Sequence, residues 1–155
     1  MHIQMNDRMA FLYRPSDSPT LPADLEDILL GGFVSGEGCA FFGKFMEPNE
    51  IASRDSLGSD YDEIQYECFV NHFHVKGESD RELVSIAVEL FRRAHAIWDN
   101  SGLLGELRFI VSVKDQEATI RFHLIREGIQ WLADDLNLYN NEAVLVYDTI
   151  ARKDI

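Results

Sequence analysis

Residues 78–100, ESDRELVSIAVELFRRAHAIWDN, are the stretch around which the rest of the chain is organised. Their apolar side chains recur at intervals of three and four residues, which places them on one face of a helix. Ser79 and Glu82 have the spacing of a capping box, so the sequence also indicates where this helix begins. The Asn-Ser-Gly sequence at 100–102 is typical of a helix end. We expect a long amphipathic helix that lies across a sheet and anchors the core.

The segments on either side of this helix have the patterns of strands and of one more helix. Alternation of apolar and polar side chains predicts a strand pair joined by a short turn, and helical spacing of apolar residues predicts a second helix. The expected elements are strands at 66–75, 107–113, 118–124 and 143–147, and a helix at 129–139. Strand, helix, strand, strand, helix, strand over residues 65–148 is the order of a ferredoxin-like sandwich.

The 155 residues are enough for a single domain with a substantial core. We expect an α+β fold, with an antiparallel sheet and helices packed on one face, over residues 1–155. Residues 1–64 would add an N-terminal extension layer of strand, helix and strand, with an extended segment at 9–13, a helix over 23–30 and a strand over 39–46. The core would span 65–148, and residues 149–155 would form a tail.

Charge is the strongest signal in the composition. Twenty-seven acidic residues against fourteen basic ones give a net charge of −13. Residues 1–60 contribute ten acids and four bases, a net of −6, and residues 61–155 contribute seventeen and ten, a net of −7. Because the excess is spread along the whole chain, the protein should repel nucleic acid and attract basic protein surfaces. Acidity of this kind also serves solubility alone.

Location in the cell can be argued from what the sequence contains. No apolar run approaches the roughly 20 residues that a membrane helix needs, and the first fifteen residues lack the apolar core of a signal peptide. Cys39 and Cys68 stand apart among apolar residues, as expected of packed, reduced thiols. We therefore expect a cytoplasmic protein.

The segment 47–63 is polar, and its end carries acids interleaved with tyrosines. Acids steer the encounter with a basic partner, and aromatic side chains supply the buried contact area. We predict that the partner-binding residues are Asp60, Tyr61, Asp62, Glu63, Tyr66 and Glu67. The competing interpretation is a solvated loop.

A glycine-rich stretch, LGGFVSGEGC at 30–39, resembles the signature helix of LAGLIDADG homing endonucleases. That resemblance implies a metal-dependent DNA endonuclease in which Glu37 is the metal-binding acid. Ser35 departs from the family pattern, and a net charge of −13 opposes binding to DNA phosphates. This is the third of three functional hypotheses.

Basic residues favour a second hypothesis, a small-molecule-binding protein or enzyme. Arg108, Arg121 and His123 are expected on the non-core face of the sheet, with His74 beside them, where they could line a pocket for an anion. His72 and His74 with His123 have the residue type of a metal site, but no acid or cysteine completes the set. Internal pairing of the arginines with acids is the alternative, and we expect neither metal nor cofactor.

Our leading hypothesis is an acidic, non-enzymatic inhibitor that binds a basic protein. In size and distributed acidity the chain resembles bacterial immunity proteins of contact-dependent growth-inhibition systems. That resemblance implies a cytotoxic nuclease domain as the partner, neutralised when its active site or substrate surface is blocked. No catalytic residue, membrane contact or direct contact with nucleic acid is expected.

Overall fold

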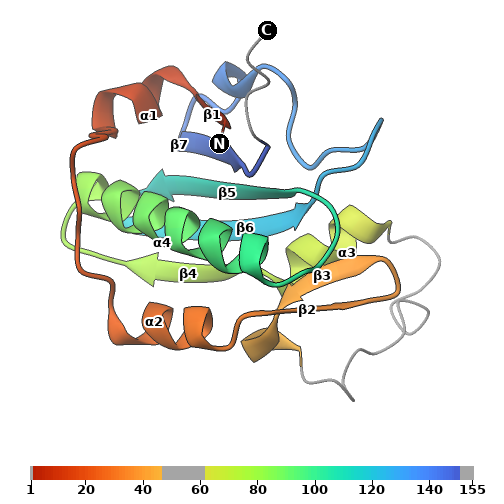
Figure 1. Cartoon of the computed structure of the whole chain (residues 1–155). Coiled ribbons are helices and arrows are strands. Elements are labelled where there is room, and N and C mark those ends of the chain that lie inside the picture. Colours follow the sequence, from red (N-terminus) through yellow and green to blue (C-terminus); the bar gives the residue numbers. More distant parts are fainter. Residues whose placement is uncertain (1, 47–61, 151–155) are drawn as a thin grey trace, which may run out of the picture.

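The computed structural model describes residues 2–46 and 62–150. It contains a five-stranded antiparallel sheet with the strand order β1-β7-β5-β6-β4, and a separate two-stranded sheet, β2-β3. The longest helix crosses one face of the larger sheet, and two shorter helices flank it (Figure 1). The predicted α+β class with an antiparallel sheet is therefore confirmed.

The elements follow one another in this order: β1 His2–Met5, α1 Asp7–Leu12, α2 Ala23–Leu30, β2 Phe33–Gly36, β3 Cys39–Phe42, the 3-10 helix η1 Gly43–Phe45, α3 Glu63–Val70, β4 Phe73–Lys76, α4 Asp80–Asn100, β5 Leu107–Lys114, β6 Glu117–Leu124, the 3-10 helix η3 Leu136–Leu138 and β7 Ala143–Asp148. Among these residues, no helix is long and apolar enough to cross a membrane.

Helix α4 lies across the sheet, as its sequence predicts (Figure 1). The Ser79 hydroxyl accepts a hydrogen bond from the backbone N–H of Glu82 at 3.1 Å, which caps the first turn. Phe91 stacks on Phe109 of β5 with 5.1 Å between ring centroids. This contact lies in the main core, which α4 forms with one face of the sheet.

The turn between β5 and β6 is the two-residue turn that the alternating strands predict. Asp115 and Gln116 have φ angles of 53° and 62°, which match the twist of a tight hairpin. Gln116 also donates from its backbone N–H to the Asp80 carboxylate and from its side chain to the Glu78 carbonyl, both at 2.8 Å. The hairpin is thus tied to the start of α4.

The ferredoxin-like arrangement over 65–148 is wrong in two respects. In such a sheet the last strand lies beside the first strand of the unit, whereas β7 pairs with β5 and leaves β4 at the sheet edge. The predicted helix over 129–139 is also absent, apart from the single 3-10 turn η3. This segment packs Leu132, Leu136 and Tyr139 over the back of the sheet instead.

The predicted strand over 66–75 is a helix followed by a shorter strand. Asp62 and Gln65 form a capping box that starts α3, so residues up to Val70 are helical. Only Phe73–Lys76 continues as a strand, and it pairs with β6. Helix α3 has only eight residues, with Tyr66, Glu67 and Cys68 buried in succession, so its sequence shows too little helical periodicity to detect.

The described residues of the range 1–64, which are 2–46 and 62–64, do not form a separate extension layer. β1 is the edge strand of the main sheet, and Met9, Leu25 and Ile28 belong to the same core as α4. The extended segment expected at 9–13 is part of helix α1, which Asn6 caps. The helix over 23–30 is confirmed as α2.

The strand expected at 39–46 ends at Phe42 because the chain turns there toward α2. A side chain on Gly43 would place its Cβ 2.4 Å from the Gly31 carbonyl oxygen, so only glycine allows this approach. Cys39 and Cys68 are both buried, as predicted. Burial raises the pKa of the Cys68 thiol to about 12, which keeps it protonated.

Candidate functional site

Half of the predicted partner-binding cluster lies in helix α3. Asp60 and Tyr61 fall outside the described residues. Asp62 and Glu63 are half-buried at the start of the helix, where the Asp62 carboxylate accepts from the Gln65 backbone N–H at 2.8 Å. Tyr66 is 3% exposed and Glu67 is fully buried. The prediction is therefore wrong for Tyr66 and Glu67, which cannot meet a partner at the surface.

Glu67 instead links three elements inside the protein. Its carboxylate accepts hydrogen bonds from the Arg126 guanidinium and from the Ala40 backbone N–H, the latter at 2.8 Å. A longer bond of 3.4 Å comes from the backbone N–H of Leu124. Burial raises the pKa of Glu67, against the effect of the hydrogen bond from Arg126. The pair joins α3, β3 and the end of β6, which is a structural role.

The combination of acids and exposed aromatic area occurs in another segment, residues 127–142, which we call the acidic loop. It contains four acids and no Lys, Arg or His. Three large apolar side chains are exposed beside them, and Leu138 is the most exposed at 67%. The acids are Glu127, Asp134, Asp135 and Glu142, and the apolar side chains are Ile129, Trp131 and Leu138.

Packing and hydrogen bonds hold the acidic loop against the sheet. Leu136 is buried against Ile110, Val144 and Val146 on the sheet face opposite α4. The Asp135 carboxylate accepts from the Asn137 backbone N–H at 3.0 Å, which caps η3. Figure 1 shows this segment leaving β6 and returning to β7. The backbone that carries these acids is therefore held against the core.

Asn6 supplies the strongest of these attachments. Its buried side chain donates to the carbonyl oxygens of Glu142 at 2.8 Å and Tyr139 at 3.2 Å, both in the acidic loop. Its side-chain oxygen accepts from the backbone N–H groups of Met9 and Val144, each at 3.0 Å. One side chain thus connects the start of the chain to the acidic loop.

A second feature is a hollow on the same side of the sheet, which we call the sheet-face hollow. It has a volume of about 360 Å³. Arg108 and His123 from the sheet and Arg126 from the end of β6 line it, together with Gly128, Ile129, Gln130 and Asp134 of the acidic loop. This is the size of a site for a small molecule.

The sheet residues of this hollow belong to a row across four strands. His2 of β1, Asp148 of β7, Arg108 of β5 and His123 of β6 are direct neighbours in register and so share one face. Arg108 donates through Nε and Nη2 to the two carboxylate oxygens of buried Asp148, both at 2.8 Å. Its pKa is raised, chiefly by this hydrogen bond. The pairing fixes Arg108 beside His123.

His123 is 1% exposed, and its two ring nitrogens differ. Nδ1 lies 2.7 Å from the carbonyl oxygen of Leu124, which can only accept, so Nδ1 carries the proton. Nε2 is buried and has no hydrogen-bond partner among the described residues. The pKa of His123 is lowered to about 4, chiefly by burial, and Arg108 and Arg126 contribute in the same direction.

The other basic residues expected on this face are confirmed there by register but do not meet in the hollow. Arg121 lies over the Trp131 ring at 5.4 Å from its centroid. His74 is exposed beside Thr119 and Glu117. Its ring lies 5.5 Å from that of His72, far along β6 from His123. Within the described residues no group of His, Cys, Asp and Glu could hold a metal ion.

Glu37 does not stand on a helix, as the endonuclease resemblance requires. Residues 33–42 form the β2-β3 hairpin, and Glu37 occupies its turn with a φ of 54°. The tight packing of two glycine-rich helices is therefore impossible at this position. The structure contradicts this part of the third hypothesis.

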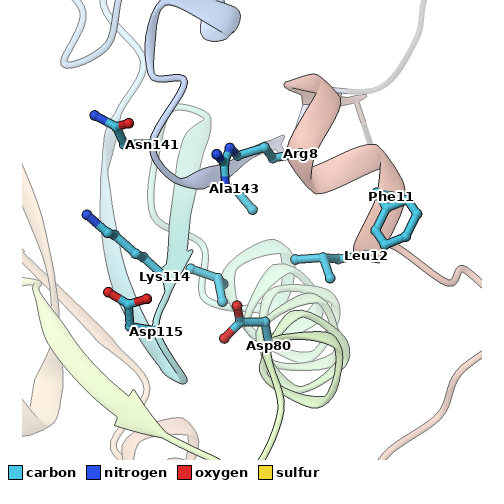
Figure 2. A pocket seen from close by; sticks show the side chains of 9 residues that line it. Arg8, Phe11, Leu12, Asp80, Lys114, Asp115, Asn141 and Ala143 are labelled. Carbon is cyan, nitrogen blue, oxygen red and sulfur yellow. The ribbon is translucent and has the colours of Figure 1, made fainter.

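A third hollow is an open groove of about 500 Å³ between α1 and the β5-β6 turn (Figure 2). Two bases, Arg8 and Lys114, and two acids, Asp80 and Asp115, line it. Asp80 already accepts the hydrogen bond from Gln116. With its charges balanced and its polar side chains mostly open to solvent, the groove offers no converging set of groups.

Sequence reasoning missed both the acidic loop and Arg126. The signal for the loop was present, since four acids, no base and an exposed tryptophan fall within sixteen residues. It was passed over because helical spacing assigned the segment to the core. Arg126 gave no signal, because its partner Glu67 is 59 residues away.

Comparisons with known proteins give one match. The model of the uncharacterized protein PM0498 family matches residues 4–154, which is all but the first three residues and the last one. No curated protein and no solved structure matches the chain.

Proposed function

The chain belongs to the uncharacterized protein PM0498 family, and from the surface described above we propose that it is an acidic, non-enzymatic inhibitor that binds a basic protein. The partner would be a cytotoxic nuclease domain, as for immunity proteins, and the complex would form in the cytoplasm. The acidic loop, residues 127–142, would be the contact surface.

The composition of the acidic loop carries this proposal. Its carboxylates would steer a basic partner toward the surface, and its exposed apolar side chains would then be buried. Trp131 is the best anchor, because a tryptophan buries a large area at little cost in side-chain entropy. Arg121 already holds one face of this ring.

Internal pairing of basic residues supports the same proposal. Arg126 is bound to buried Glu67, and Arg93 forms a bidentate pair with Glu26. Such paired arginines add little positive potential outside the protein, because the partner charge lies within a few ångströms. The acids of the acidic loop have no base in their own segment, and Arg108 and Arg126 beside the loop are each paired with a carboxylate.

The mechanism of inhibition would be occlusion. A nuclease binds nucleic acid through a positive surface, because it must neutralise phosphates. Carboxylates of the acidic loop would occupy that surface and exclude the substrate. A standard interface of about 1,600 Å² is expected, larger than the acidic loop alone. Neighbouring residues of the sheet and of α1 would complete it.

The test is binding to the product of the gene immediately upstream. That product should be toxic when expressed alone, and this protein should bind it and block its nuclease activity. The association rate should fall steeply with salt, because steering between opposite charges is screened. A neighbour that is harmless, or that does not bind, would sink the proposal.

Variants locate the surface. Trp131→Ala should raise Kd by about 30-fold or more, as for an anchor residue. Phe69→Ala is the matched control, because Phe69 is 58% exposed on α3, outside the acidic loop, and it should change Kd less than threefold.

A charge pair gives a second, independent comparison. Asp134→Asn with Asp135→Asn should slow association, whereas Asp24→Asn with Asp27→Asn on exposed α2 positions should not. Asparagine at 135 keeps the cap of η3, so the loop should stay folded. If both double variants slow association equally, the acidic loop is not the contact surface.

A further inference from the structure

The sheet-face hollow contains a buried group that the protein itself leaves unused. His123 Nε2 bears a lone pair, because the ring proton is on Nδ1 and points to the Leu124 carbonyl oxygen. The nitrogen is buried and has no partner among the described residues. A buried acceptor without a donor is costly, and native proteins seldom keep one without a reason.

The residues around Nε2 restrict which donor could satisfy it. Arg108 and Arg126 flank the histidine, and both guanidiniums are held in place, by Asp148 and by Glu67. Guanidinium groups can only donate hydrogen bonds, so a cationic donor at Nε2 would find no acceptor on either arginine. The described residues also contain no group of His, Cys, Asp and Glu that could hold a metal ion. A hydroxyl group can donate to Nε2 without bringing positive charge.

The same arginines supply what the rest of such a ligand needs. Arg108 uses Nε and Nη2 for Asp148, so the N–H groups of its Nη1 remain for an acceptor. The opposite wall is formed by Gly128, Ile129, Gln130 and Asp134, and the hollow has a volume of about 360 Å³. An anionic group of the ligand would lie toward Arg108 and away from the Asp134 carboxylate. A hydroxyl next to an anionic group would meet both the acceptor and the guanidinium.

We propose that the sheet-face hollow binds a small anion that carries a hydroxyl group, with the hydroxyl donating to Nε2 of His123 and the anionic oxygens accepting from Arg108. This site shares Ile129 and Asp134 with the proposed contact surface, but the argument for it does not depend on the proposed function. Because the acidic loop forms one wall, the ligand would also brace that loop.

The experiment compares anions that differ only by the hydroxyl. Malate and succinate form one pair, and 2-hydroxyethyl phosphate and ethyl phosphate form a second pair for the phosphate class. Each is titrated at constant ionic strength and pH 7, with the ring nitrogens of His123 followed by NMR and those of exposed His74 as an internal reference. The hydroxylated member of at least one pair should shift the Nε2 signal saturably and bind about tenfold or more tightly.

Two results would overturn the proposal. One is that neither hydroxylated anion binds more tightly than its partner. The other is that His123→Phe, shown by circular dichroism to be folded, binds the hydroxylated anion as well as the wild type does. The wild-type titration stands by itself if His123→Phe fails to fold. If the hydroxylated anion binds at His123 but the protein does not bind the product of the upstream gene, the proposed ligand site is supported and only the proposed function is wrong.

Discussion

At the scale of single residues, His123 connects burial to pH dependence. Its pKa is about 4 in the folded protein, against 6.5 for an ordinary histidine, because burial disfavours the charged ring. Arg108 and Arg126 act in the same direction, and Asp148 and the Leu124 carbonyl oppose them. The folded state therefore keeps His123 neutral where the unfolded chain already protonates it.

The sign of the pH effect follows from this difference. As the pH falls through 6.5 the unfolded chain takes up a proton that the folded protein refuses until about pH 4, so protons favour unfolding. The contribution of His123 to stability is complete above pH 6.5 and is lost toward pH 4, by about 3 kcal/mol in all. We expect His123→Phe to remove this part of the slope in urea unfolding between pH 7 and 4.5.

A matched histidine variant separates this effect from the titration of the many acids. His74→Gln changes an exposed strand residue and should keep the slope of the wild type. If the free energy of unfolding has the same pH dependence in the wild type and in His123→Phe, His123 does not resist protonation in the folded protein, and the prediction is wrong.

At the scale of elements, α3 explains why a cluster of acids was mistaken for a contact surface. Asp62 is the N-cap of this helix, and buried Glu67 accepts a hydrogen bond from Arg126. Both acids therefore stabilise the fold. A short helix buried on several sides has no clear apolar stripe, so its sequence does not distinguish it from a strand.

Two substitutions separate the contribution of Asp62 to stability as a helix cap from any contribution of its charge. Asp62→Ala should destabilise the protein by about 1 kcal/mol, because the Gln65 backbone N–H loses its acceptor. Asp62→Asn removes the same charge but still caps, so it should leave the free energy of unfolding nearly unchanged. Both are measured by urea unfolding. Equal losses for Ala and Asn would show that the charge rather than the cap is what matters.

The acidic loop shows how an element with helical spacing remains irregular. Its carbonyl groups at Leu136, Tyr139 and Glu142 point to the Asn6 side chain. The Ala133 N–H bonds to the Tyr139 hydroxyl at 2.9 Å. These partners take the backbone groups that a helix would pair internally, and apolar packing on the sheet is kept without one.

At the scale of the whole molecule, Asn6 closes the chain on itself. It caps α1, bonds to β7 and holds the acidic loop, so it joins segments more than 130 residues apart. Asn6→Ala leaves the buried N–H groups of Met9 and Val144 without their acceptor. We expect a loss on the order of 3 kcal/mol in urea unfolding.

Asn6→Asp tests the same connection from the other side. A carboxylate can accept from both N–H groups but cannot donate to the carbonyls of Tyr139 and Glu142, so this variant should also be strongly destabilised. Asn100→Ala, at the exposed end of α4, is the control and should lose less than about 0.5 kcal/mol. A mild effect of both Asn6 variants would mean that the loop is held by packing alone.

The sequence by itself determined what depends on neighbours along the chain. It predicted α4 with its cap at Ser79, the β5-β6 hairpin, strand β7 and the α+β class. Each has a periodicity or a local signal long enough to outweigh alternatives. The net charge of −13 also follows from the sequence alone. So does the placement of Arg108 and His123 on the non-core face, because alternation along each strand determines it.

Only the tertiary structure decided which partners those residues have. The position of β7 beside β5, the burial of Glu67 and the lone pair left on His123 Nε2 all depend on segments tens of residues apart. Such contacts leave no periodic trace, because a hydrogen bond across the fold requires only that two side chains arrive at one place. The acidic loop has the apolar spacing of a helix for the same reason. In the structure its apolar side chains pack on the sheet, and its carbonyl groups bond to Asn6 instead of to each other.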